Sequence, residues 1–224
     1  MIKIPLLRIC TLFLIFLTVS CATVESKRTE YWHQRVSLFD ELSVGTDDIV
    51  FFGNSITDGG EFHELFNMPN IKNRGINGDN VSGLIERAGQ ITKGKPSKIF
   101  ILIGINDIAQ GHSVSQIVAE YQKLINKLQK ETPDSKIYVQ SVMPINNDFG
   151  RYKSLVGKEA LIPAVNKELE ELAKNNKLTY IDLWPILAEP STGKLFESYT
   201  PDGLHLSGKA YKAWTDLLLP YLNE

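Results

Sequence analysis

Cysteine is almost absent from this chain of 224 residues. Cys10 and Cys21 are the two examples, and residues 22–224 contain none, so disulfide bonds cannot be part of the fold. Zinc-binding patterns are missing as well, because the chain has no His-Glu-x-x-His motif and no cysteine pair of metal-binding spacing. These absences argue against a disulfide scaffold and against a zinc site.

An excess of charge of one sign is also missing. The chain has 24 basic and 26 acidic side chains, and no lysine and arginine cluster is dense enough to neutralise a row of phosphates. We therefore expect no nucleic-acid partner. Flexible linkers, low-complexity tracts and internal repeats are absent too, while 43% of the residues are hydrophobic. Residues 31–224 are accordingly predicted to form one domain.

Long hydrophobic runs are limited to the beginning of the chain. Residues 9–19 are apolar and uncharged, but this stretch is shorter than the roughly 20 residues that a membrane-spanning helix needs. Lys3 and Arg8 precede it, which is typical of a signal peptide. Residues 17–21 resemble a bacterial lipoprotein signal, in which a small residue precedes a cysteine that becomes the lipidated N-terminus.

The start of the chain therefore predicts a location. We expect a lipoprotein signal peptide over residues 1–20, lipid on Cys21 and a polar tether over residues 21–30. The lipid would anchor the protein to a membrane of the bacterial cell envelope. An ordinary secretory leader with an incidental cysteine is the alternative.

Short apolar runs alternate with amphipathic segments along the rest of the chain. The runs are typical of strands buried on both faces, and they cover residues 48–53, 98–104, 136–142 and 178–183. Residues 70–74 form a weaker extended segment that we also interpret as a strand. Apolar residues recur at helical spacing within residues 117–128, 165–173 and 210–221. This alternation predicts an α/β fold with a parallel sheet covered by helices, in which ligands bind beyond the carboxyl ends of the strands.

Polar residues of catalytic types follow these strands. Ser55 follows an apolar run, Gly53 and Asn54, at a position where an exposed hydroxyl is well placed for a nucleophile. A helix-capping serine is the alternative. His205 could take the serine proton, and Asp202 is close enough in sequence to reach its other ring nitrogen. The sequence therefore predicts a proton relay. Lacking such partners, the other histidines are assigned to the surface or to packing: His33, His63 and His112.

Two further residues have both a structural and a functional interpretation. Asn106 follows the most hydrophobic strand, and its side chain either forms a turn or donates a hydrogen bond to an oxyanion. Gly78 is either a turn glycine or a residue whose backbone amide approaches a ligand.

The motifs together resemble the SGNH (GDSL-like) hydrolases, a family named after the Ser, Gly, Asn and His of its active site. Its four sequence blocks correspond, in order, to residues 51–58, 73–79, 104–107 and 202–205. Asn54 stands where the family usually has aspartate, and we expect this to change local hydrogen bonding without loss of activity. The serine and glycine blocks look most similar to the platelet-activating-factor acetylhydrolase-like and carbohydrate O-acetylesterase branches.

The resemblance implies a fold, a reaction and a set of site residues. The fold is a flavodoxin-like three-layer α/β/α sandwich with a parallel sheet of about five strands. The reaction is ester hydrolysis without a metal or another cofactor. Ser55, His205 and Asp202 would form the catalytic triad, while the backbone amides of Ser55 and Gly78 and the side chain of Asn106 would form the oxyanion hole.

The substrate is constrained less closely. No long apolar insertion suggests a lid or a fatty-acid tunnel, which favours short acyl groups such as acetate on a small molecule or a glycan. The alternatives are a lysophospholipase or thioesterase of the same family, or a catalytically silent carbohydrate-binding lipoprotein. The irregular stretch 145–158 either recognises the substrate or is a solvated loop. Nothing in the sequence indicates an oligomeric state.

Overall fold

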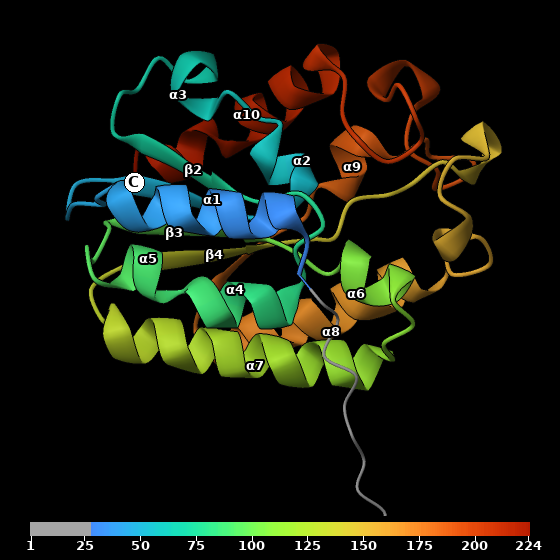
Figure 1. Cartoon of the computed structure of the whole chain (residues 1–224). Helices are drawn as coiled ribbons and strands as arrows, with labels where there is room; N and C mark the ends of the chain where they lie inside the picture. The colour runs from blue at the N-terminus through green and yellow to red at the C-terminus, as the bar shows by residue number, and fades with distance from the viewer. Residues whose placement is uncertain (1–27) are drawn as a thin grey trace, which may run out of the picture.

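The computed structural model describes residues 28–224, which form a five-stranded sheet between two layers of helices (Figure 1). All the strands are parallel, and their order is β2-β1-β3-β4-β5. The strands are β1 (Ile49–Gly53), β2 (Ile71–Gly75), β3 (Lys98–Leu102), β4 (Lys136–Gln140) and β5 (Thr179–Ile181). The predicted three-layer α/β/α fold is confirmed.

Helices cover both faces of the sheet (Figure 1). On one face lie α4 (Val81–Arg87), α7 (Val114–Glu131) and α8 (Leu161–Asn175); on the other lie α3 (Phe62–Leu65) and α10 (Gly208–Leu222). The remaining elements are α1 (Glu30–Glu41), α2 (Ser55–Asp58), α5 (Gly89–Thr92), α6 (Ile105–Ala109), α9 (Trp184–Leu187), η1 (Asn147–Phe149), η2 (Lys153–Leu155) and η3 (Glu197–Tyr199).

A ladder of aromatic side chains fixes one helical layer on the sheet. The strand register places Phe51 beside Phe100 and Phe100 beside Tyr138, and their rings stack with centroids 5.0 and 4.3 Å apart. Phe62 of α3 stacks on Phe51, and Trp214 of α10 meets Phe62 edge-on. Stacked and edge-on pairs are both favourable for aromatic rings. The ladder therefore sets the positions of α3 and α10.

The helical spacing in the sequence is explained by burial on the opposite face. The apolar residues at that spacing in α7 are buried except for the partly buried Val118, and those of α8 over residues 165–173 are buried as well. Ser113 begins α7 with a capping box, in which its side chain and that of Gln116 each accept from the other's backbone amide. These two helices thus form where the apolar periodicity predicts them.

The predictions for the beginning of the chain fall almost entirely outside the described residues. The structure describes residues 28–224, so three of these predictions lie outside it: the signal peptide over residues 1–20, Cys21 and most of the tether over residues 21–30. Within residues 28–224, none of the helices is long and apolar enough to cross a bilayer. Arg28 already contacts the domain through Asn80, and Thr29 caps α1.

Candidate active site

Ser55 lies at the carboxyl edge of the sheet, where β1 turns into α2. It is the first residue of this short helix, and the helix cap is the preceding Asn54, whose side chain accepts from the Ile56 amide at 3.0 Å. The capping interpretation of Ser55 is therefore wrong, because Asn54 has that role. An amide oxygen accepts this bond as a carboxylate would, so the asparagine preserves the cap.

The turn that presents Ser55 has room for glycine alone. A Cβ atom on Gly53 would lie 2.3 Å from the Thr57 hydroxyl and 2.4 Å from the Leu102 carbonyl oxygen. Asn73 of β2 fixes α2 from the other side, because its amide nitrogen donates to the carbonyls of Thr57 and Gly60 at 2.7 Å each. The turn that carries the serine is thus held between the Asn73 side chain of β2 and the backbone of β3.

Ser55, His205 and Asp202 form one continuous chain of hydrogen bonds. The Ser55 Oγ lies 3.0 Å from His205 Nε2, and His205 Nδ1 lies 2.8 Å from Asp202 Oδ2. The structure therefore brings together all three residues of the predicted relay. With the Nδ1 proton directed at the carboxylate, Nε2 is left to accept the serine proton.

The Asp202 carboxylate is held on both of its oxygens. Oδ1 accepts from the backbone amides of Leu204 at 2.9 Å and His205 at 2.8 Å, while Oδ2 accepts from His205 and from the Tyr152 hydroxyl. Burial alone would raise the pKa of Asp202, but these hydrogen bonds together hold it well below its ordinary value. Asp202 is consequently ionised and fixed in orientation at neutral pH.

The two other residues predicted for the oxyanion hole lie next to each other. The side-chain amide of Asn106, in α6, donates to the carbonyl of Asp79 at 2.7 Å, which places it against the turn that contains Gly78. Gly78 has a φ of +78°, and this backbone conformation explains the glycine, since a Cβ there would meet open space. Neither Ser55 nor Gly78 donates its backbone N–H to a backbone oxygen within residues 28–224.

A buried ion pair supports the turn at Gly78. Asp79 accepts from Arg87 Nε at 2.7 Å and from the Trp32 indole at 3.1 Å, and Arg87 also donates to the Gly53 carbonyl at 3.0 Å. The turn is thereby tied to the end of β1. Sequence reasoning missed this pair, although an arginine on the buried face of a helix is an unusual feature that could have indicated it.

Asp107 is a second buried carboxyl behind the site. It accepts from the Val81 amide at 3.2 Å, at the start of α4. Burial raises the pKa of Asp107 to about 6, because the charged form loses solvation. Asp107 thus connects α6, which carries Asn106, to the helix that follows the Gly78 turn.

Tyr152 contacts two residues of the triad, and the sequence patterns did not indicate this contact. Its hydroxyl donates to Asp202 Oδ2 at 2.7 Å and lies 2.9 Å from His205 Nδ1. The tyrosine belongs to the irregular stretch between β4 and α8, so no spacing pattern relates it to residues some 50 positions later.

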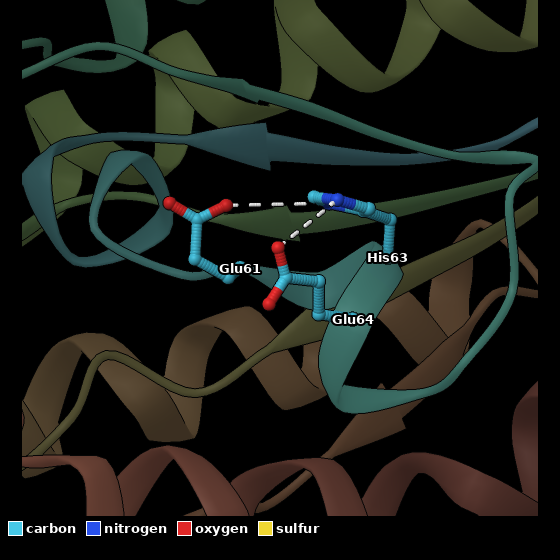
Figure 2. A group of neighbouring side chains, drawn as sticks. All are labelled: Glu61, His63 and Glu64. Carbon is cyan, nitrogen blue, oxygen red and sulfur yellow. Dashed lines mark ion pairs between the residues drawn. The ribbon is translucent and has the colours of Figure 1, made fainter.

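One group of side chains away from the triad has the residue types of a metal site. Within the part of the chain that the structure describes, Glu61, His63 and Glu64 are the three such residues that lie close together (Figure 2). His63 directs Nδ1 toward Glu61 at 4.0 Å and Nε2 toward Glu64 at 3.6 Å, and all three are exposed. Opposite nitrogens of one ring cannot bind the same ion, so this arrangement is one of exposed polar side chains and not of metal ligands. His63 is a surface residue, as predicted.

Comparisons with known proteins relate this fold and site to a family. Residues 51–213 match the model of the GDSL-like lipase/acylhydrolase family. A structure from Streptococcus pneumonia, described as a platelet activating factor, is 29% identical with a TM-score of 0.77, covering 86% of this chain and 92% of that one. An acylhydrolase structure from Bacteroides fragilis is 22% identical with a TM-score of 0.77, covering 88% and 98%.

Two further relatives are named for carbohydrates. An acetyl-xylooligosaccharide esterase from Geobacillus Stearmophilus is 17% identical with a TM-score of 0.63, covering 82% of this chain and 97% of that one. An N-acylneuraminate cytidylyltransferase from Streptococcus agalactiae serotype III is 25% identical over 143 residues, or 64% of this chain and 32% of that protein. The chain thus spans about a third of the length of the curated relatives that it matches.

The match over residues 51–213 places the chain in the GDSL-like lipase/acylhydrolase family. Residues 51–213 therefore form an ester-hydrolysing enzyme domain, as the sequence blocks predict.

Proposed function

We propose that this enzyme is a serine esterase that removes short acyl groups, acetyl above all, from carbohydrates. The observation that carries the proposal is the hydrogen-bonded chain from Ser55 Oγ through His205 to Asp202, with links of 3.0 and 2.8 Å. Ser55 is the nucleophile, His205 the general base and Asp202 the group that orients and stabilises the imidazolium.

The proposed reaction uses the triad, the oxyanion hole and water. Ser55 Oγ attacks the ester carbonyl carbon while its proton moves to His205 Nε2, and the oxyanion accepts hydrogen bonds from the Ser55 and Gly78 amides and from Asn106. The carbon–oxygen bond to the sugar then breaks, and the sugar oxygen takes the proton from His205. Water then attacks the acyl carbon while His205 takes one of its protons. The bond to Ser55 Oγ breaks, Oγ takes this proton from His205, and acetic acid is released.

Short acyl groups are favoured by the connections at the carboxyl edge of the sheet. The segment between β4 and α8 contains two short 3-10 helices, η1 and η2, and its exposed side chains include Asp148, Arg151 and Lys153. A long acyl chain would need an apolar tunnel to leave water. The relatives named for acetyl-xylooligosaccharides and N-acylneuraminate support a sugar as the alcohol.

Acetate release from purified protein tests the substrate class. The panel contains acetylated xylo-oligosaccharides, O-acetylated N-acylneuraminate and p-nitrophenyl esters from acetyl to decanoyl, with Ser55→Ala as the blank. We expect acetate from at least one sugar and rates that fall as the acyl chain lengthens. Faster turnover of long esters would indicate a lysophospholipase or thioesterase instead. Inactivity on every ester would indicate a silent binding protein.

Asn106→Ala tests the oxyanion hole. If the Asn106 amide stabilises the oxyanion more than the ground-state carbonyl, kcat should fall by roughly 10² to 10³ with KM nearly unchanged. Both constants are measured with p-nitrophenyl acetate, together with the melting temperature of the same preparation.

The control is an asparagine with a purely structural contact. Asn176 donates from its side chain to the Leu172 carbonyl at 2.8 Å, at the end of α8. Asn176→Ala should lower the melting temperature and leave kcat unchanged. If Asn106→Ala behaves in the same way, Asn106 shapes a turn and does not belong to the oxyanion hole.

We further propose that Cys21 carries the lipid that anchors the enzyme to the cell envelope. Several acyl chains bind a bilayer firmly, whereas one binds only marginally. Cys21→Ser should therefore move the protein from the membrane fraction to the soluble fraction. Cys10→Ser is the matched control, because residue 10 lies in the predicted signal peptide and should not affect location. Membrane retention of a cleaved Cys21→Ser protein would refute lipidation.

A further inference from the structure

Tyr152 contacts the two members of the triad that lie behind the nucleophile. Its hydroxyl is 2.7 Å from Asp202 Oδ2 and 2.9 Å from His205 Nδ1. The phenol and imidazole rings meet edge-on, with centroids 5.7 Å apart. The three polar atoms therefore form a closed triangle on the side of the imidazole that faces away from Ser55.

The segment that carries Tyr152 is attached on both sides of the site. At its beginning, the Asn146 amide donates to the Gly203 carbonyl at 2.7 Å, between Asp202 and His205 in sequence. At its end, the Lys158 ammonium donates to the carbonyls of Ile108 at 3.0 Å and Ala109 at 2.9 Å. Those carbonyls belong to the end of α6, the helix that carries Asn106.

These attachments give Tyr152 a fixed position relative to the triad. Gly203 approaches the segment so closely that a Cβ there would lie 2.2 Å from the Asn146 carbonyl oxygen. The backbones of the two loops are thus in direct contact beside Asp202. A tyrosine held in this way can hold another group in place.

Tyr152 fills an acceptor position on the Asp202 carboxylate that the other main donors leave open. A carboxylate has about four acceptor positions, and two on Oδ1 are taken by the backbone amides of Leu204 and His205. On Oδ2, His205 Nδ1 takes one position and Tyr152 the other. Without the phenol, Oδ2 would have a free lone pair and the carboxylate could twist or bind water.

We propose that Tyr152 is a positioning residue that acts through Asp202 and His205, and that it completes the hydrogen bonding of the carboxylate that orients the imidazole. The proposal rests on the triad mechanism proposed above. Burial raises the pKa of Tyr152 to about 12, so the phenol stays protonated and remains a donor throughout the working range of an esterase. Because the hydroxyl proton is already donated to Asp202, Tyr152 has none left to donate to a substrate.

Tyr152→Phe is the direct test, since it keeps the ring and removes the hydroxyl. We expect kcat to fall on the order of tenfold, as for a lost hydrogen bond to a charged group, with KM changed less than twofold. The acidic midpoint of the kcat/KM profile should move upward by several tenths of a pH unit. The reason is that the Asp202 carboxylate, with one hydrogen-bond donor fewer, attracts the neighbouring imidazole proton more strongly.

Tyr138→Phe is the matched control. It also removes a bond from a tyrosine hydroxyl to a carboxylate, Glu224, at 3.2 Å, but near the end of the chain and away from the triad. This variant should change neither kcat nor the pH profile. A decrease in melting temperature alone, in either variant, indicates a structural role.

A double-mutant cycle shows whether Tyr152 acts through Asp202. In an Asp202→Ala background, which has no carboxylate to position, Tyr152→Phe should cause no further loss of kcat. A full tenfold loss there would overturn the proposal, and so would a raised KM with unchanged kcat, which would indicate a substrate contact. Ser55→Ala distinguishes failure of the triad mechanism from failure of the Tyr152 proposal. If Ser55→Ala remains active, the triad mechanism is wrong, independently of the results for Tyr152→Phe.

Discussion

Replacing Ser55 by alanine should lower kcat for acetyl esters by about 10⁶, and His205→Ala should have an effect of the same size. The reason is that serine and imidazole act as one unit. The hydroxyl is a weak nucleophile without the base 3.0 Å away, and the base has no proton to take without the hydroxyl. Turnover of p-nitrophenyl acetate by the purified variants measures the loss, and near-normal turnover in either would end the assignment.

Ser113→Ala is the control for this experiment. Ser113 is a true capping serine, and its replacement should reduce the stability of the fold by about 1 kcal/mol without affecting kcat. Ser55→Ala should show the opposite pattern, because Asn54 provides the cap of α2. Melting temperature and kcat measured together therefore separate a catalytic serine from a structural one.

The strands of the sheet were predictable from the sequence to different degrees. β1 and β3 are buried at every position, so their apolar runs stand out. β2 is an edge strand with Lys72, Asn73 and Arg74 in its middle, and its pattern is correspondingly weak. Two of these polar side chains make specific hydrogen bonds. Asn73 binds the carbonyl of Thr57 in α2, and Arg74 donates to the Leu42 carbonyl. A strand that also serves the site loses part of its hydrophobic signal.

The triad was predictable because its parts lie in recognisable local contexts. Ser55 follows a buried strand, and Asp202 and His205 are three residues apart, so a single turn brings carboxylate and imidazole together. Tyr152 has no such context, because it reaches Asp202 through a loop whose path depends on backbone contacts such as Asn146 to Gly203. Contacts made by irregular loops depend on tertiary structure and leave no periodic trace in the sequence.

The supports of the Gly78 turn escaped prediction for a different reason. Asp79 and Asn80 both have side chains that can cap α4, and the sequence alone does not distinguish them. In the structure Asn80 is the cap, because its side chain accepts from the Gly83 amide at 3.0 Å. The Asp79 carboxylate instead accepts hydrogen bonds from Arg87 and Trp32. A buried ion pair is favourable only when its remaining hydrogen bonds are satisfied, and that depends on neighbours distant in sequence, such as Trp32.

Asp202→Asn should lower kcat by about 10⁴, less than the loss expected for Ser55→Ala. An asparagine can present its amide nitrogen to His205 Nδ1, which favours the tautomer with the proton on Nε2. That tautomer cannot accept the serine proton, although the ring stays close to its place. Asp148→Asn is the control, because Asp148 is an exposed carboxylate paired with Lys194 at 2.7 Å and should be neutral for kcat. Equal losses in the two variants would contradict the role of Asp202.

The same variant has a predictable effect on stability. The pKa of Asp202 is lower in the folded protein than its ordinary value of 3.8, so the folded state binds fewer protons than the unfolded state. Its ionised form therefore stabilises the fold above about pH 4, and this contribution is lost as the pH falls through the lower, folded-state pKa. Melting temperatures of the wild type and Asp202→Asn should differ most near pH 7 and converge in acid. A gap that persists unchanged down to pH 2 would show that packing, and not charge, is what the substitution removes.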